Sequence, residues 1–135
     1  MLRVLSGILM VLHGLVHFWY VVLSQGWVEF QPEMGWTGES WLLVSLLEDP
    51  AIRLLAAVSY GLATLGFVVG GVGLFVAQEW WRPFIVGSAV LSATTVLLFW
   101  DGHGQMLVEK GLIGLLIDLG LLVALLIFGW PSVAL

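Results

Sequence analysis

Long apolar runs, broken by single polar residues at helical spacing, make up most of the chain. Four of them approach the roughly 20 residues that a helix needs to cross about 30 Å of hydrocarbon. They cover, approximately, 4–24, 53–77, 83–100 and 107–130. Pro50 precedes the second run, Pro83 falls in the first turn of the third, and Pro131 follows the fourth. The pattern predicts an all-α polytopic membrane protein, a four-transmembrane-helix up-down bundle forming a single domain over 1–135.

The segment 25–50 is the one long loop between these runs. It ends in a mostly apolar stretch that begins near Trp41, and Thr37 or Ser40 can cap a short helix there. Because that stretch is apolar on most sides, we expect it to lie in the membrane interface or over the end of the bundle. The first loop is therefore predicted to be partly helical.

Composition agrees with a membrane location and excludes several functions. Hydrophobic residues make up 61% of the chain and charged residues 10%, against about 25% charged in soluble domains. The partner is therefore the lipid bilayer. Four Lys and Arg at a net charge of −5 leave no basic surface for nucleic acid. The absence of cysteine excludes disulfides, thiolate nucleophiles and zinc–thiolate sites.

Orientation in the membrane is poorly determined by the basic residues. Arg3 and Arg82 fall on one side of the predicted bundle, Arg53 and Lys110 on the other, so their count is a tie. Most acidic residues lie in the first and third loops. This asymmetry favours an orientation with both termini cytoplasmic.

Polar residues in the first run share one helical face. They are Ser6, His13, His17, Tyr20 and Ser24, at steps of 7, 4, 3 and 4. Lipid cannot satisfy their hydrogen bonds, so the stripe is predicted to face the bundle interior. Phe18 and Leu23 are expected to point elsewhere.

The other runs carry shorter stripes that complete a candidate site. The third has Ser88, Ser92 and Thr95, the fourth Gly111, Gly114 and Asp118, and the second Arg53, Tyr60 and Thr64. Depth along each helix is counted inward from the first and third loops, at about 1.5 Å per residue. It allows a ligand-binding cluster in the outer half of the bundle, the half nearest those loops. Its predicted members are His13, His17, Tyr20, Tyr60, Thr95 and Asp118. The predicted pocket mouth is Asp101, His103 and Glu109.

Asp118 is the most costly residue to insert. A charged Asp at a helix centre costs roughly 2.5–3.5 kcal/mol on insertion scales, so it needs a partner or water. His17 and Tyr60 are the predicted partners. Asp118 is either a structural link between helices or a functional proton or ligand site.

His13 and His17 have the i,i+4 spacing with which two imidazoles share one metal. The sequence His13-Gly14-Leu15-Val16-His17 lacks the glutamate of H-E-x-x-H. Hydrogen-bonded packing is the simpler interpretation, and metal or haem ligation is the alternative. Gly66 and Gly70 form a small-xxx-small face that suits helix contact within the chain, or between chains in a homo-oligomer or larger membrane complex.

Several stretches together resemble a known group of proteins. They are 13–17, 35–43 (GWTGESWLL), 80–83 (WWRP), 99–102 (FWDG) and 110–118 (KGLIGLLID). Over nearly its whole length the chain resembles small prokaryotic four-helix membrane proteins, similar in size and layout to DoxX-like proteins. The resemblance implies a prokaryotic membrane bundle, and by analogy of layout quinone-linked or redox-stress functions.

Three functions are compatible with these residues. The first is a binding module whose polar pocket holds a quinone, a lipid fragment, haem or a metal, alone or as a subunit of a membrane complex. The second is a purely structural bundle. The third is an enzyme or proton-coupled carrier with His17 and Asp118 as acid and base. The sequence favours the first, because it supplies a polar pocket, the histidine stripe and one aspartate. The third ranks last, because the sequence offers no nucleophile motif and no inverted repeat.

Overall fold

Helices make up the fold, and no strand occurs among residues 1–29, 31 and 34–131, which the computed structural model describes. The long helices are α1 (Leu2–Ser24), α2 (Asp49–Phe75), α3 (Trp81–Leu98) and α4 (Ile113–Leu126). A 3₁₀ turn, η2, covers Leu43–Ser45, and a π-helical turn, η3, covers Val108–Leu112. The all-helical prediction is confirmed.

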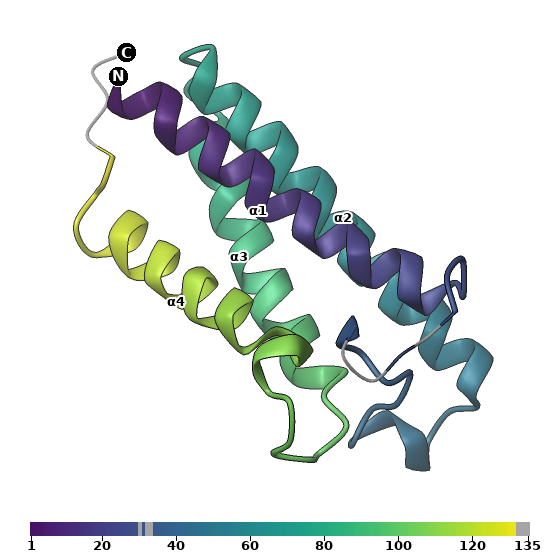
Figure 1. Cartoon of the computed structure of the whole chain (residues 1–135). Coiled ribbons are helices and arrows are strands. Elements are labelled where there is room, and N and C mark those ends of the chain that lie inside the picture. Colours follow the sequence, from purple (N-terminus) through teal and green to yellow (C-terminus); the bar gives the residue numbers. More distant parts are fainter. Residues whose placement is uncertain (30, 32–33, 132–135) are drawn as a thin grey trace.

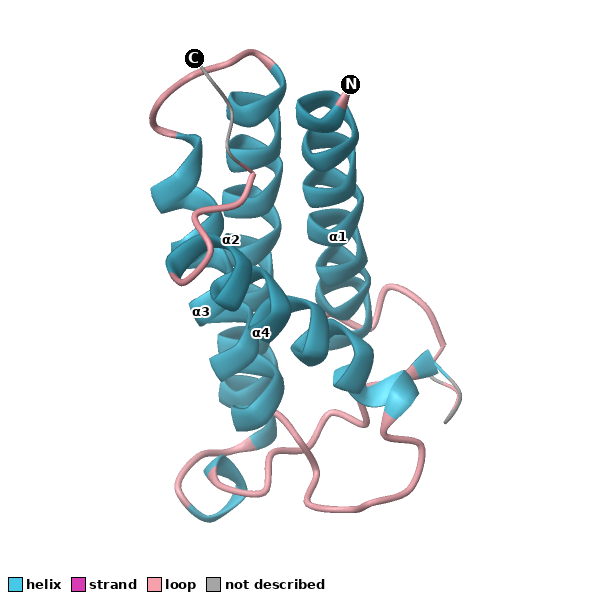
Figure 2. Ribbon diagram, turned by 90° about the vertical axis from the view of Figure 1, so that its left-hand side faces the viewer, coloured by secondary structure: helices cyan, strands magenta, loops and turns pink. Residues whose placement is uncertain are grey.

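Successive helices run in opposite directions (Figure 1). α1 lies along α2, α2 packs on α3, and α4 runs obliquely across α3 (Figure 2). Glycines allow the closest of these approaches. A Cβ added at Gly14 would lie 2.7 Å from the Cβ of Phe67, and one at Gly7 would lie 2.9 Å from the carbonyl oxygen of Gly71. The α1–α2 contact therefore depends on the absence of side chains at these positions.

Three helices, α1, α2 and α3, are long and apolar enough to cross a membrane. They support the prediction of a membrane protein. α4 has 14 residues, about 21 Å at 1.5 Å per residue, and is shorter than the predicted run 107–130. Gly111, at φ 104°, interrupts the helix ahead of it. A left-handed glycine breaks helical geometry without changing the apolar pattern, so the pattern alone overestimated the helix.

The polar stripe of α1 faces the interior as predicted, since all five of its residues are buried. Phe18 is exposed, which also agrees. The expectation for Leu23 was wrong: its side chain is 4% exposed and belongs to a core cluster with Trp36 and Ile52. The first loop folds back over this end of α1 and covers a second face of the helix.

The first loop caps the end of α3. The indole nitrogens of Trp36 and Trp41 donate to the carbonyl oxygens of Phe99 (2.8 Å) and Leu97 (2.9 Å). The Ser40 hydroxyl donates to Leu98 O at 2.5 Å. These carbonyls belong to the last turn of a helix, where no intrahelical donor remains. The loop thus supplies the donors that α3 lacks.

The helical turn with described bounds in this loop is η2, and Met34 is also in 3₁₀ geometry. The N-cap residue of η2 is Leu42, which makes no side-chain capping bond, rather than the predicted Thr37 or Ser40. Ser40 Oγ does accept a hydrogen bond from the backbone N–H of Leu43, the first residue of the turn, at 3.1 Å. Thr37 Oγ1 is buried without a hydrogen-bond partner in the described part of the chain. The described residues of the loop confirm that it is partly helical.

Gly66 and Gly70 both face α3. A Cβ at Gly66 would meet the Ser88 hydroxyl, and one at Gly70 would lie 2.6 Å from Ile85 Cδ1. This small-residue face therefore makes a helix contact within the chain. Association into a homo-oligomer or a larger membrane complex stays a prediction.

Candidate functional site

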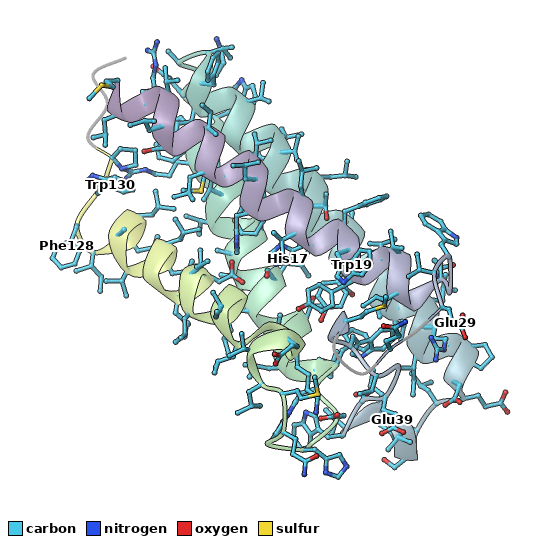
Figure 3. The ribbon with its side chains drawn as sticks, viewed as in Figure 1. His17, Trp19, Glu29, Glu39, Phe128 and Trp130 are labelled. Atoms are coloured by element: carbon cyan, nitrogen blue, oxygen red, sulfur yellow. The ribbon has the colours of Figure 1, made fainter. Side chains whose placement is uncertain are left out.

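Three helices bring four polar side chains to one buried point. His13 and His17 come from α1, Ser92 from α3 and Asp118 from α4. His17 projects from α1 towards the interior of the bundle (Figure 3). Asp118 and Ser92 are fully buried, and the two histidines are nearly so. We call these four residues the polar cluster.

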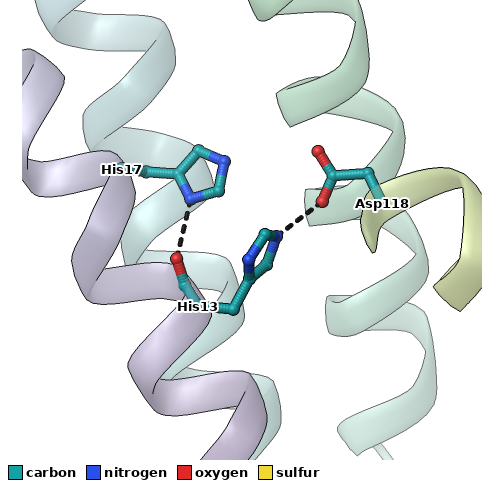
Figure 4. A group of neighbouring side chains, drawn as sticks. All are labelled: His13, His17 and Asp118. Atoms are coloured by element: carbon teal, nitrogen blue, oxygen red, sulfur yellow. Dashed lines mark hydrogen bonds and ion pairs between the residues drawn. The ribbon is translucent and has the colours of Figure 1, made fainter. Parts of the chain in front are cut away.

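Hydrogen bonds join all members of the polar cluster. His13 Nε2 donates to Asp118 Oδ1 at 2.8 Å (Figure 4). The Ser92 hydroxyl donates to Asp118 Oδ2 at 2.5 Å, and His17 Nε2 contacts the same hydroxyl. His17 Nδ1 donates to the carbonyl oxygen of His13 at 2.9 Å. Each carboxylate oxygen of Asp118 therefore has a partner.

The contacts limit where protons can sit in the cluster. A carbonyl oxygen only accepts, so His17 Nδ1 carries a hydrogen. Two arrangements then satisfy every contact without net charge. In one, His17 is protonated on both nitrogens and Asp118 is ionised. In the other, the Ser92–Asp118 bond is reversed: Asp118 is protonated and donates to Ser92, Ser92 donates to His17 Nε2, and both rings are neutral. Neutrality suits a site within a membrane, where an uncompensated charge is costly.

The partners of Asp118 differ from those predicted. His13 and Ser92 contact the carboxylate, and His17 reaches it only through Ser92. In the sequence analysis, the depth of Asp118 in the membrane was estimated by counting residues from the start of the fourth run. That count does not determine which of His13 and His17, one turn apart on α1, meets the carboxylate, and in the structure it is His13.

Ser92 is the site residue that sequence reasoning missed. Its position in the polar stripe of the third run was recognised, but Thr95 was the member of that stripe assigned to the predicted ligand-binding cluster. The sequence signal existed, because Ser92 is four residues from Ser88 and three from Thr95. Which of the three reaches Asp118 depends on the rotation of α3, which spacing does not determine.

The other predicted ligand-binding residues lie beside the polar cluster rather than in it. The Tyr60 ring is 6.3 Å from that of His17 and stacks on Tyr20 at 4.8 Å between centroids. The Tyr20 hydroxyl donates to the carbonyl oxygen of Glu109 at 3.0 Å. Thr95 Oγ1 donates to Leu91 O within its own helix. These residues occupy the layer between the cluster and the predicted mouth.

At the predicted mouth, Asp101 forms an ion pair. Its Oδ2 lies 2.6 Å from Lys110 Nζ, and its Oδ1 accepts the backbone N–H of His103 at 2.9 Å. The side chains of His103 and Glu109 are exposed. Burial opposes ionisation of Asp101, but the Lys110 ammonium and the His103 N–H outweigh it and hold the pKa of Asp101 below its ordinary value.

Acid should weaken this end of the bundle. The ordinary Asp pKa is about 3.9, and the folded-state pKa of Asp101 lies below it. Its stabilising contribution is therefore complete above pH ~4 and is lost as pH falls through the folded-state pKa. Thermal unfolding in detergent across pH 3–6 would measure this loss, and the Asp101→Asn variant should show a smaller one. Identical pH profiles for the two proteins would contradict the assignment.

Three pockets lie away from the polar cluster. One of about 250 Å³ lies between the end of α3 and the start of α4, where its apolar wall includes Val96 and Leu115 and Lys110 stands at its edge. Two others, of about 180 and 330 Å³, lie in the α1–α2 and α2–α3 grooves. None of these three is lined by a cluster residue. The cluster is a closed hydrogen-bonded network.

No family model matches the sequence, and neither the curated proteins nor the solved structures searched contain a match. The function is therefore inferred from the arrangement of the side chains.

Proposed function

We propose that this chain is a small integral membrane protein that binds a small ligand at the polar cluster of His13, His17, Ser92 and Asp118. The observation that carries this proposal is the complete burial of Asp118 among polar side chains from three helices. In a membrane, an ionisable residue within a span is costly and marks a functional site by default. Apolar side chains of similar volume would pack such a bundle without that cost.

We also propose that the chain crosses the membrane a fourth time. η3, α4 and the residues that follow together cover the predicted run 107–130, although α4 alone is short. Both described ends of the chain lie at the same end of the bundle (Figure 1), as four spans require. We further propose the cytoplasmic membrane of a prokaryote, with both termini cytoplasmic.

The absence of cysteine makes this topology directly testable. Gln78→Cys and Gly104→Cys each place one thiol in an exposed loop, at opposite ends of α3. We expect a membrane-impermeant thiol reagent to label them from opposite sides of the membrane. An epitope tag after Leu135 should be accessible from the side of Cys at position 78. A tag on the side of position 104 would contradict a fourth span.

Ligand binding is testable without knowing the ligand. Native mass spectrometry of the protein released from detergent should show an adduct that is lost in His17→Ala. Ser6→Ala is the matched control, since Ser6 is buried on the same stripe but outside the cluster. We expect this variant to keep the adduct. Wild-type protein that carries no adduct of any mass would contradict the proposal.

An enzyme or proton-coupled carrier that uses His17 and Asp118 stays the alternative prediction. The two residues are joined through Ser92, which suits acid–base chemistry. Turnover or transport needs repeated passage of substrate to these residues, more than a bound ligand needs, and the three pockets described above do not reach them. A structural bundle without ligand is the remaining possibility.

A further inference from the structure

Three members of the polar cluster can offer ligand atoms to one ion. One atom each from His13, His17 and Asp118 lies within 4.8 Å of the others. Atoms bound to a common metal at about 2.1 Å lie roughly 3.0–3.4 Å apart. His13 Nε2 and Asp118 Oδ1, at 2.8 Å, are already close to that separation. Side-chain movements of about an ångström would complete the site.

His17 is oriented as metal-binding histidines are. Such a residue usually donates its other ring N–H to a carboxylate or a backbone carbonyl, which fixes the ring and its tautomer. His17 Nδ1 donates to His13 O, so Nε2 is the nitrogen directed at Ser92 and Asp118. The hydrogen bond within α1 thus presents a ligand nitrogen to the centre of the cluster.

The donor set indicates the class of metal. Two imidazoles and one carboxylate suit Zn²⁺, Fe²⁺, Mn²⁺ or Co²⁺, whereas Cu⁺ favours thiolate or thioether sulfur and Ca²⁺ favours oxygen ligands alone. The Ser92 hydroxyl contacts both His17 and Asp118 and adds a neutral oxygen beside the ion. Three protein ligands also leave coordination positions open to water.

The walls of the cluster favour an ion over a larger ligand. The Phe67 ring lies 4.8 Å from the His13 ring and 5.5 Å from the His17 ring, between centroids. The Tyr60 ring closes the side towards the mouth. A porphyrin or a quinone ring would have to displace these fully buried aromatic side chains, whereas an ion occupies the space between the ligand atoms.

We infer that the ligand of the polar cluster is one divalent first-row transition-metal ion, held by His13, His17 and Asp118. This inference rests on the proposed ligand-binding function and names its ligand class. Substitution of one of these three metal-binding residues should weaken metal binding by more than roughly 10–100-fold. That smaller loss is typical when a residue that only orients a metal-binding side chain is removed.

Cobalt titration is the direct test. Protein purified without chelators is analysed for bound metal, then stripped, and Co²⁺ alone is titrated into the detergent solution while visible absorption is recorded. We expect one Co²⁺ per chain, with ligand-field bands that Zn²⁺ abolishes by competition. His17→Ala and Asp118→Asn should lose the bands. His103→Ala is the matched control, because His103 is the third histidine and is exposed, and this variant should bind as wild type does.

A readout on unmodified protein keeps the test valid if a cluster variant fails to fold. In ¹⁵N-histidine NMR spectra, the His13 and His17 signals are assigned as those missing from the spectra of His13→Gln and His17→Gln. Zn²⁺ should shift these two signals in the unmodified protein and leave the His103 signal in place. A shift of His103 alone, or binding that survives in folded His17→Ala, would overturn the inference. An adduct in native mass spectra that contains no metal would overturn it while the ligand-binding function stands. Absence of both metal and adduct would remove both.

Discussion

Asp118→Leu should be among the most destabilising single substitutions in this chain. It leaves the His13 N–H and the Ser92 hydroxyl without the acceptors they now have, and each buried group left unpaired costs about 1–3 kcal/mol. Asp118→Asn should be mild, because its amide oxygen can accept from His13 while its NH₂ group donates to Ser92. Thermal unfolding in detergent with a chelator present measures both effects without a contribution from bound metal.

The order of these two variants is informative. If Leu is tolerated better than Asn, the contacts of Asp118 do not stabilise the fold, and the residue is retained for function at a cost to stability. That result would favour the enzyme or proton-coupled carrier. Equal stability of both variants would mean that the carboxylate reaches water and that the polar cluster is an open cleft.

Gly14→Ala should destabilise the bundle and disturb the polar cluster together. The new methyl group would lie 2.7 Å from Phe67 Cβ and 3.1 Å from the carbonyl oxygen of Thr64, so α1 and α2 must move apart. Overpacking of this kind costs about 1–3 kcal/mol. Gly14 lies between His13 and His17, and both ligands would move with it. We expect a lower unfolding temperature and weaker Co²⁺ binding.

Gly87→Ala is the matched control for this prediction. Gly87 lies within α3, and a Cβ there would meet no atom within 4 Å. Alanine loses less conformational entropy than glycine on folding, so this substitution should stabilise the helix by about 0.5–1 kcal/mol. If Gly14→Ala behaves like Gly87→Ala, the close contact of α1 with α2 is not as the structure describes.

The first helix and its polar face could be predicted from the sequence because they depend on local spacing. Residues at steps of 3, 4 and 7 share a face in any α-helix, and polar residues within a bilayer must face protein. His13 and His17 are buried for this reason. Depth along the helices allowed these histidines to lie near Asp118, but which of them contacts its carboxylate depends on how the helices cross.

The details that spacing missed depend on tertiary geometry. The burial of Leu23 arises from a loop that returns over α1. The choice of Ser92 as the partner of Asp118 follows from the rotation of α3. The short α4 follows from the left-handed backbone at Gly111, beside the Val96 side chain and the Tyr20 hydroxyl. None of these features produces a regular spacing of polar or apolar residues in the sequence.

The capping of α3 by the first loop also constrains the order of folding. Trp36 and Ser40 donate to carbonyls 63 and 58 residues further along the chain. During synthesis these acceptors emerge well after the loop itself, and contacts between distant positions form slowly because the intervening chain must first be ordered. The loop therefore cannot reach its final structure until α2 has turned back and α3 is complete. Shortening of the chain before Leu97 should expose the Trp36 side chain, which is 4% exposed in the folded protein, with α1 and α2 already paired.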